Sequence, residues 1–273
     1  MESNLFEVLR KPSDGKPEKI FLRDPDGEPL TYSEVFKISG RYSAALHECG
    51  VKEGDRVLVK VEKSIDALAL YLACLQSGAI YVPSNPRNTV EETEYLSQDA
   101  EPSLVVFSHG CVQNVNSRSE TLGKINGSLT SLAESLPGTD QVTQRSGSDL
   151  AAMLYTSGTT GKPKGAMLSH RGLIANAIAL HDIWGFEPED VLLHCLPVFH
   201  VHGLFVALHC SMLSASEVIF LNKFEPDTVL DHLKEATVMM GVPTHYVRLL
   251  SSSRFDYDLC AHMRLFTSGS APM

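Results

Sequence analysis

Hydrophobic positions along the chain follow helical spacing in some segments and form short β-branched runs in others. In the clearest helical segment, apolar side chains recur at residues 35, 38, 42 and 45, after a capping box at 31–34. Similar spacing and stop signals predict further helices at 64–77, from 89 onward, 129–136, 169–184, 203–212, 228–235 and 244–250. Buried strands are predicted at 56–61, 79–82, 104–107, 150–155, 166–168, 191–196, 218–221, 237–242 and 264–267.

Alternating helices and strands are typical of α/β proteins, in which layered, mostly parallel sheets carry helices on their faces. Residues 108–149 interrupt the alternation, because Ser, Gly, Asn and Thr are frequent there and only one weak helical patch remains. We interpret this stretch as a linker or boundary between two subdomains, at about 1–148 and 149–273. A length of 273 residues agrees with that division.

The composition excludes several classes of protein. Hydrophobic residues make up 43% and charged residues 21%, which is typical of globular chains. The net charge of −10 argues against a general nucleic-acid binder, since neutralising phosphates requires clustered Lys and Arg. No apolar run approaches the roughly 18 residues that span a bilayer. The acidic N-terminus lacks a leader pattern, so we expect a cytoplasmic protein, with the mitochondrial matrix as the alternative.

The segment 156–165, Thr-Ser-Gly-Thr-Thr-Gly-Lys-Pro-Lys-Gly, contains the strongest chemical signal in the sequence. Glycines let backbone N–H groups converge on an anion, while hydroxyls and lysines add donors and positive charge for a polyphosphate. The segment is not a Walker A loop, because its first two glycines are too close together and Pro163 follows Lys162. A glycine-rich hairpin tip with no ligand is the alternative interpretation.

These ten residues resemble the phosphate-loop signature of the adenylate-forming superfamily, which includes acyl-CoA synthetases, luciferases and the adenylation domains of peptide synthetases. Residues 196–204 (LPVFHVHGL) resemble its second core motif, and 267–272 (TSGSAP) resemble the stretch that opens its adenine site. Within the superfamily the chain looks most like malonate–CoA ligases, on the stretches 61–64, 81–83, 240–244 and 262–266. The resemblance covers nearly the whole chain and is weakest at 108–149.

The resemblance implies part of the N-terminal domain of an acid–thiol ligase. Malonate and ATP, accompanied by Mg²⁺, would form an acyl-adenylate and pyrophosphate, and the CoA thiolate would then displace AMP. The expected small-molecule partners are therefore malonate, ATP and CoA, with no nucleic acid. The residues expected to bind the phosphates of ATP are Thr156, Ser157, Gly158, Thr159, Thr160, Gly161, Lys162, Lys164 and Gly165.

The second and third motifs supply the candidates for the acyl site. His200 is the expected catalytic and substrate-binding residue, because its position in the family lines the junction of carboxylate pocket and CoA tunnel. Arg248 is our choice for malonate's second carboxylate, to which a guanidinium offers two parallel hydrogen bonds. The segment Ser268, Gly269 and Ser270 is expected to flank the acyl pocket and the adenine edge. The alternatives are a structural core histidine and a surface arginine.

Four histidines lie close together in the sequence, at positions 194, 200, 202 and 209. No Cys or carboxylate lies near them at the usual zinc spacings, so we predict no metal site there. The superfamily's Mg²⁺-binding Glu, ribose-binding Asp and adenylation Lys belong to segments for which this chain has no counterpart. We therefore expect an incomplete form that does not ligate malonate to CoA on its own.

Two other functions remain open from the sequence. The chain could be a non-catalytic paralogue with at most weak nucleotide binding. It could also belong to a ligase for another carboxylate, such as a medium-chain or coumarate-like acid. Arg248 favours malonate over an apolar acid, because a buried guanidinium without an acidic partner is energetically costly.

Overall fold

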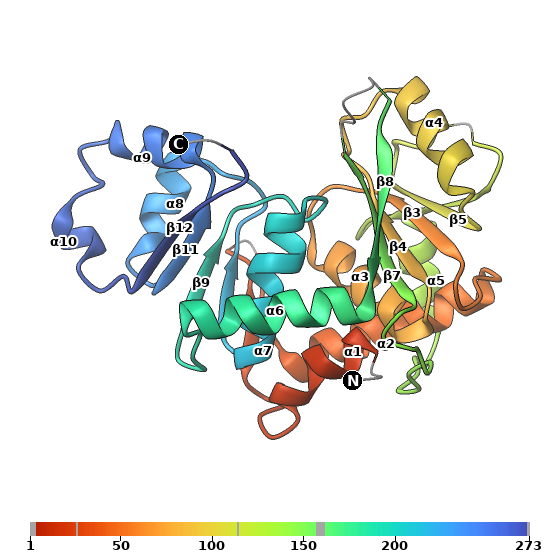
Figure 1. The fold of residues 1–273 in the computed structure, drawn as a ribbon, viewed down its shortest axis with the longest axis horizontal. Coiled ribbons are helices and arrows are strands. Elements are labelled where there is room, and N and C mark those ends of the chain that lie inside the picture. Colours follow the sequence, from red (N-terminus) through yellow and green to blue (C-terminus); the bar gives the residue numbers. More distant parts are fainter. Residues whose placement is uncertain (1–3, 26, 114, 157–161, 272–273) are drawn as a thin grey trace. The chain divides into compact units, whose positions relative to one another are not determined.

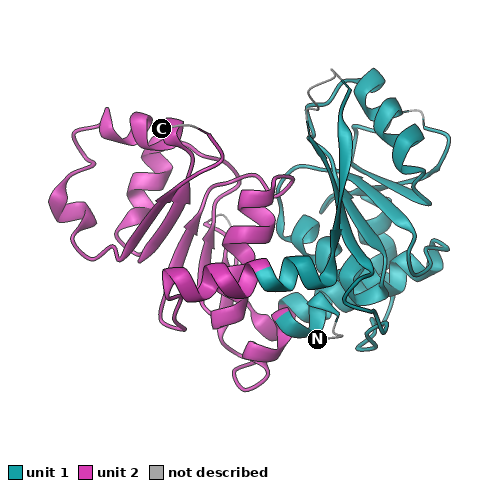
Figure 2. Cartoon of the chain, viewed as in Figure 1, with its two compact units in different colours: residues 1–8, 35–175 teal, residues 9–34, 176–273 magenta. Residues whose placement is uncertain are grey.

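The computed structural model describes residues 4–25, 27–113, 115–156 and 162–271, and the chain folds into two compact units (Figures 1 and 2). Unit 1 comprises residues 1–8 and 35–175, and unit 2 comprises residues 9–34 and 176–273. Each unit is built around one six-stranded sheet. The α/β class with layered, mostly parallel sheets is therefore confirmed.

The sheet of unit 1 has the strand order β6-β5-β3-β4-β7-β8. Neighbouring strands run parallel, except that β7 and β8 form an antiparallel hairpin. Its strands are β3 (Arg56–Lys60), β4 (Ile80–Pro83), β5 (Leu104–Ser108), β6 (Arg118–Leu122), β7 (Leu150–Thr156) and β8 (Lys164–Ser169). Helices that lie wholly or mostly in this unit are α1 (Leu5–Arg10), α2 (Tyr32–Glu48), α3 (Ile65–Ser77), α4 (Val90–Ala100) and α5 (Ser128–Ser135).

The sheet of unit 2 has the strand order β12-β11-β9-β10-β1-β2, and only β1 and β2 pair antiparallel. Its strands are β1 (Ile20–Arg23), β2 (Leu30–Thr31), β9 (Val191–His194), β10 (Glu217–Phe220), β11 (Val238–Gly241) and β12 (Leu265–Ser268). The remaining helical segments are η1 (Lys11–Ser13), α6 (His170–Trp184), the π-helical η2 (His202–Leu208), α7 (His209–Ser214), α8 (Pro226–Leu233), α9 (Pro243–Leu250) and α10 (Tyr257–Cys260).

Local sequence signals account for the ends of several helices. The Ser64 hydroxyl accepts a hydrogen bond from the Ala67 N–H at the start of α3, and Gly78 ends that helix with a φ of +74°. At the start of α4, Thr89 and Glu92 make both hydrogen bonds of a capping box. The predicted starts of both helices are confirmed. The capping box also fixes the first turn of α4, the helix that contacts the β7–β8 hairpin.

Residues 108–149 belong to unit 1 rather than forming a linker between the units. This stretch contains β6 and α5, and the Gln76 side chain donates hydrogen bonds to the carbonyl oxygens of Thr139 and Gln141. Because β7 and β8 complete the same sheet, the division between units falls within α6 instead of near residue 148. The polar composition suggested a linker, because it does not reveal the hydrogen bonds by which the side chain of Gln76 holds this backbone.

The hydrophobic core behind the hairpin joins the sheet of unit 1 to α4. Its buried members are Leu58, Ile80, Val82, Leu96, Ala100, Val105 and Phe107. Met153 and Tyr155 of β7 pack against the same cluster, so one face of the hairpin rests on the core. In the part of the chain that the structure describes, no helix is long and apolar enough to cross a membrane.

Candidate functional site

The β7–β8 hairpin brackets the segment predicted to bind phosphate, and strands flank it on both sides as expected. Thr156 pairs with Lys164, and Tyr155 pairs with Gly165, at the end of the hairpin nearest the loop. Ser157, Gly158, Thr159, Thr160 and Gly161 lie outside the described residues. The structure therefore describes the two arms of this segment and leaves the predicted role of its centre a prediction.

The two lysines of the hairpin are exposed. The Lys162 ammonium lies 5.7 Å from the centroid of the Tyr95 ring, within the range of a cation–π contact. Lys164 begins β8 and lies opposite Thr156 in the ladder. Both positive charges are therefore available to an anion at this end of the hairpin.

Gly165 has a packing role that its place in the motif did not reveal. A Cβ at this position would lie 2.9 Å from Met153 Sδ and 3.4 Å from Tyr155 Cζ. These two side chains of β7 thus cover the glycine on the neighbouring strand. The requirement for glycine here comes from close packing, in addition to any contact with phosphate.

A second group of candidate residues lies at the carboxyl ends of the parallel strands of unit 2. The segments that leave these strand ends begin at Cys195 after β9, Leu221 after β10, Val242 after β11 and Gly269 after β12. Ligands of open α/β sheets bind at this edge, because consecutive loops converge there. The structure brings Ser270 to this edge, where its hydroxyl lies 3.3 Å from Nδ1 of His202.

His202, rather than His200, makes the contact with the third motif. A Cβ added to Gly269 would lie 3.6 Å from Cε1 of His202, and the Gly269 N–H donates to the Gly241 carbonyl. His200 is exposed, and its ring lies 4.3 Å from that of Phe199. The pKa of both histidines is lowered because neighbouring atoms take water away from the rings, although His200 keeps much of its surface accessible to solvent. Both rings are therefore mostly neutral at pH 7. The predicted role of His200 stays a prediction.

Arg248 is exposed on α9, and its guanidinium carbon lies 5.0 Å from the centroid of Phe224. The helix begins at Pro243, with Val242 before it, so Thr244 lies within the first turn and does not cap it. Leu249 of the same helix is fully buried. Arg248 therefore projects away from the core, where an aromatic ring limits the positions of its charged group.

His245 and Phe224 are site residues that the sequence did not single out. The two rings stack with centroids 3.9 Å apart and an angle of 2° between their planes. Nδ1 of His245 also lies 3.9 Å from the Cys195 sulfur. Burial, followed by the nearby charges of Arg248 and His202, lowers the pKa of His245 to about 4. The only sequence signal for His245 was its place three residues before Arg248.

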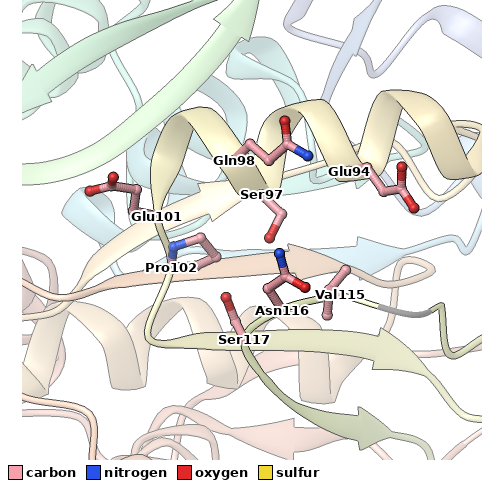
Figure 3. A pocket seen from close by; sticks show the side chains of 8 residues that line it. All are labelled: Glu94, Ser97, Gln98, Glu101, Pro102, Val115, Asn116 and Ser117. Carbon is pink, nitrogen blue, oxygen red and sulfur yellow. The ribbon is translucent and has the colours of Figure 1, made fainter.

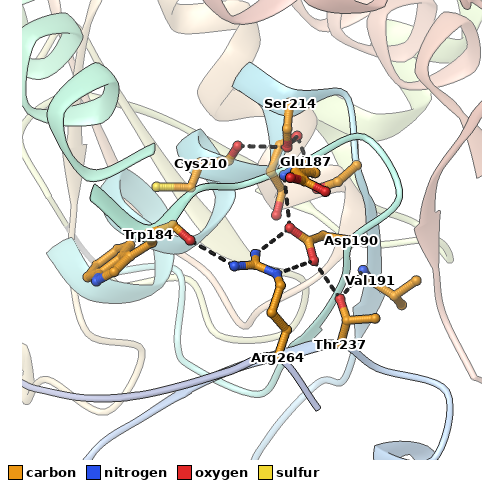
Figure 4. A network of polar contacts seen from close by, with 10 residues as sticks. Trp184, Glu187, Asp190, Val191, Cys210, Ser214, Thr237 and Arg264 are labelled. Atoms are coloured by element: carbon orange, nitrogen blue, oxygen red, sulfur yellow. Dashed lines mark hydrogen bonds and ion pairs between the residues drawn. The ribbon is translucent and has the colours of Figure 1, made fainter. Parts of the chain in front are cut away.

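An ion pair between the exposed Arg264 and the buried Asp190 holds the strand that leads to Ser270 (Figure 4). Arg264, immediately before β12, donates hydrogen bonds to both carboxylate oxygens of Asp190 and to the Trp184 carbonyl. Asp190 also accepts hydrogen bonds from the Thr237 hydroxyl and the Glu187 N–H. Burial alone would raise the pKa of Asp190, but these donors outweigh it and lower that pKa. The pair therefore fixes the start of β12 against the segment that precedes β9.

A pocket of about 410 Å³ lies in unit 1 beside α4, away from the predicted phosphate-binding residues (Figure 3). Glu94, Ser97, Gln98 and Glu101 line it from α4 and its end, and Val115, Asn116 and Ser117 line it from the segment before β6. Among the described residues, no group of three His, Cys, Asp or Glu side chains is placed to hold a metal ion.

Comparison with known proteins adds the family. Residues 9–273 match the family described as AMP-binding enzyme. MatB from Rhodopseudomonas palustris has the same fold over the whole chain, with a TM-score of 0.94 and 44% sequence identity, and the chain covers 56% of it. MatB has also been solved with ATP bound, with the same fold similarity.

Two curated relatives carry the names of ligases for different acids. The mitochondrial malonate–CoA ligase of Mus musculus is 34% identical over 285 residues, which cover 94% of this chain and 48% of that protein. The 4-coumarate–CoA ligase 5 of Oryza sativa subsp. japonica is 28% identical, over 97% of this chain and 52% of that protein. The chain spans about half the length of these relatives. Because the family match extends over residues 9–273, the chain belongs to the AMP-binding enzymes.

Proposed function

We propose that this chain carries the ATP- and acid-binding residues of an acid–thiol ligase that activates malonate. The main support is the 44% identity to MatB across the whole chain, in a fold with a TM-score of 0.94. A structure of MatB contains ATP, and a malonate–CoA ligase from Mus musculus is 34% identical to this chain. The similarity to MatB covers the whole chain, so it includes the β7–β8 hairpin and the candidate residues of unit 2.

The proposed reaction has two steps. A carboxylate oxygen of malonate attacks the α-phosphorus of ATP, and the bond to pyrophosphate breaks, which gives malonyl-adenylate. The thiolate of CoA then attacks the acyl carbon, and AMP leaves as malonyl-CoA forms. Both steps bring negatively charged groups together, so the protein must position them and offset their charge.

The hairpin residues would act on the phosphate side of this reaction. Lys162 and Lys164 are exposed cations on the two sides of one proline, and Thr156 lies opposite Lys164. They would bind the β- and γ-phosphates and stabilise the departing pyrophosphate. Mg²⁺ is the ordinary companion of ATP and would offset part of the charge on its phosphates. Within the ranges that the structure describes, no group of three His, Cys, Asp or Glu side chains is placed to hold a metal ion, so none is named as its ligand.

The cluster in unit 2 would act on the acid side. Arg248 presents a guanidinium beside Phe224, and a carboxylate can accept two parallel hydrogen bonds from such a group. His245, with its pKa lowered to about 4, is neutral at pH 7 and adds a polar ring without a second charge. One carboxylate of malonate would pair with Arg248 while the other reacts. His200 and Ser270 would belong to the same acid-binding part of unit 2.

ATP binding by the chain is the first test, and calorimetric titration measures it without requiring turnover. A lost hydrogen bond to a charged group corresponds to about 10- to 150-fold in affinity, which is the loss expected for Lys164→Ala. Lys37→Ala, which removes an exposed lysine of α2, is the matched control and should bind ATP as the unaltered chain does. No ATP binding by the unaltered chain would overturn the proposal.

Acid selectivity is the second test. The matched region makes up 56% of MatB, so a chimera of this chain with the rest of MatB supplies the residues outside that region. We expect malonate to support ATP–pyrophosphate exchange better than propionate or 4-coumarate does. Faster exchange with 4-coumarate would favour the alternative acid, and no exchange with any acid would favour a non-catalytic chain.

A further inference from the structure

The strands β7 and β8 flank the predicted phosphate-binding segment, and we call them the two arms of the phosphate hairpin. The helix α4 contacts both arms, and both contacts come from one face of the helix. The Tyr95 hydroxyl donates a hydrogen bond of 2.9 Å to the Pro163 carbonyl, just before β8. The Tyr155 hydroxyl of β7 donates a hydrogen bond of 2.6 Å to Asp99 Oδ2. Tyr95 and Asp99 are four residues apart, so they lie on the same side of α4, one turn from each other.

The Tyr95 ring also contacts the first lysine of the hairpin. The Lys162 ammonium lies 5.7 Å from the ring centroid, so the residue that fixes Pro163 also confines the neighbouring positive charge. Both tyrosine rings pack against the core of unit 1, while their hydroxyls reach across to the opposite element. Burial, with the hydrogen bond to Asp99, raises the pKa of Tyr155, so its hydroxyl remains a donor at pH 7.

The position of α4 is set without the hairpin. The capping box of Thr89 and Glu92 fixes its first turn. The buried Lys60 of β3 donates hydrogen bonds to the Thr93 hydroxyl, at 3.0 Å, and to the Asn88 carbonyl. Leu96 and Ala100 are buried in the core. The helix is therefore a firm support to which the hairpin is attached.

We propose that Tyr95 and Asp99 are positioning residues for ATP: they hold the two arms of the phosphate hairpin, and with them Lys162, in place before the nucleotide binds. This inference rests on the proposed ATP binding. Neither residue belongs to the motif at 156–165, and no contact of either with the nucleotide is required. Holding the two arms in advance reduces the conformational entropy that the arms would otherwise lose when ATP binds.

The experiment compares variants of the chain by two measurements. Amide hydrogen exchange of β7 and β8, without nucleotide, reports whether the arms are held, and calorimetric titration with ATP reports affinity. Tyr95→Phe keeps the ring and removes one hydrogen bond, which corresponds to about two- to tenfold. We expect exchange in the hairpin to accelerate and the dissociation constant for ATP to rise by that factor, with exchange in β11 and β12 unchanged.

Two further comparisons separate positioning from loss of structure. Asp99→Ala and Tyr155→Phe should accelerate hairpin exchange and raise the dissociation constant for ATP to the same extent, because both changes remove the same hydrogen bond. A variant that combines the two changes should differ little from either single variant. Asp99→Asn retains an acceptor oxygen and should restore hairpin exchange and ATP affinity toward those of the unaltered chain. Gln98→Ala alters the pocket face of the same helix and is the matched control.

The outcomes distinguish this inference from the proposed function. Unchanged hairpin exchange in Tyr95→Phe would overturn the inference, and so would faster exchange with unaltered ATP affinity. Failure of the unaltered chain to bind ATP would overturn the proposed function, and the nucleotide part of the inference with it. The exchange measurement would then still decide whether α4 holds the hairpin.

Discussion

The two candidate regions differ in how their residues are distributed along the chain. The phosphate hairpin is one continuous segment, in which β7 and β8 flank a motif of ten residues. The cluster in unit 2 combines His202, Phe224, His245 and Ser270, which come from four separate segments. The comparison shows why the two were not equally visible in the sequence. Glycines and lysines at fixed spacing mark a loop, whereas the cluster depends on parallel strands that bring distant segments together.

The largest expected effect is on the support of the distributed cluster. Removing Arg264 leaves the buried carboxylate of Asp190 without its charged partner. Because Arg264 itself is exposed, we place Arg264→Ala at the low end of the roughly 3–5 kcal/mol typical of breaking a buried pair, at about 3 kcal/mol. Urea denaturation measures this loss, and hydrogen exchange should show β12 loosened while β7 and β8 remain protected. Arg254→Ala, which removes an exposed arginine of unit 2 paired with the exposed Asp231, should cost much less, because solvent screens such a pair. Equal losses in the two variants would contradict the importance assigned to the pair of Arg264 with Asp190.

The next effect tests what the cluster binds. Arg248→Ala should weaken the binding of malonate by about 10- to 150-fold, the value of a hydrogen bond to a charged group. Propionate, which lacks the second carboxylate, should be affected far less. Thermal shift measurements with each acid in the presence of ATP provide the comparison. Losses of equal size for the two acids would move the selectivity for malonate to another candidate residue of unit 2, such as His200 or Ser270.

A smaller effect tests the packing of the continuous segment. Gly165→Val would place side-chain carbons against Met153 and Tyr155, and overpacking of this kind costs about 1–3 kcal/mol. We expect a lower urea midpoint and weaker ATP binding. Gly15→Val is the control, because a Cβ on Gly15 meets no atom within 4 Å. If Gly165→Val were as stable as the control variant, packing would not explain this glycine.

The smallest effect concerns the end of β8 farthest from the loop. His170 is buried, its Nδ1 accepts a hydrogen bond from the Leu5 N–H, and burial lowers its pKa to about 4. In the unfolded chain the pKa of a histidine is about 6.5, so as the pH falls His170 is protonated in the unfolded chain before it is protonated in the folded one. The contribution of neutral His170 to the free energy of unfolding is therefore fully present above about pH 6.5 and is lost toward pH 4. Between pH 7 and 5.5 the loss is about 1 kcal/mol.

Urea denaturation at pH 7 and 5.5 measures this dependence, with His170→Gln as the comparison. The variant should lose less stability between the two pH values, because it lacks the titrating ring, whereas the other histidines contribute equally to both proteins. The same slope in both proteins would show that His170 does not titrate as described.

Secondary structure could be predicted where apolar periodicity and caps coincide, as in α3 and α4. The sequence did not reveal β6, because its segment, Arg-Ser-Glu-Thr-Leu, is polar and the strand pairs only with β5 at the edge of the sheet. An edge strand with little burial requires no apolar alternation. The short strand β1 was also missed, because its parallel partner β10 lies nearly 200 residues later in the chain.

The candidate site shows the same division. Composition and spacing were sufficient to single out the glycine-rich loop, its lysines and its flanking strands, because turn chemistry and charge are local properties. The resemblance to adenylate-forming enzymes came from three sequence motifs, each of them a continuous segment. Only the tertiary structure showed that Tyr95 and Asp99 hold that hairpin, that His202 contacts Ser270, and that His245 stacks on Phe224. These contacts join residues far apart in sequence, and their formation depends on strand order, sheet register and burial, which no local pattern encodes.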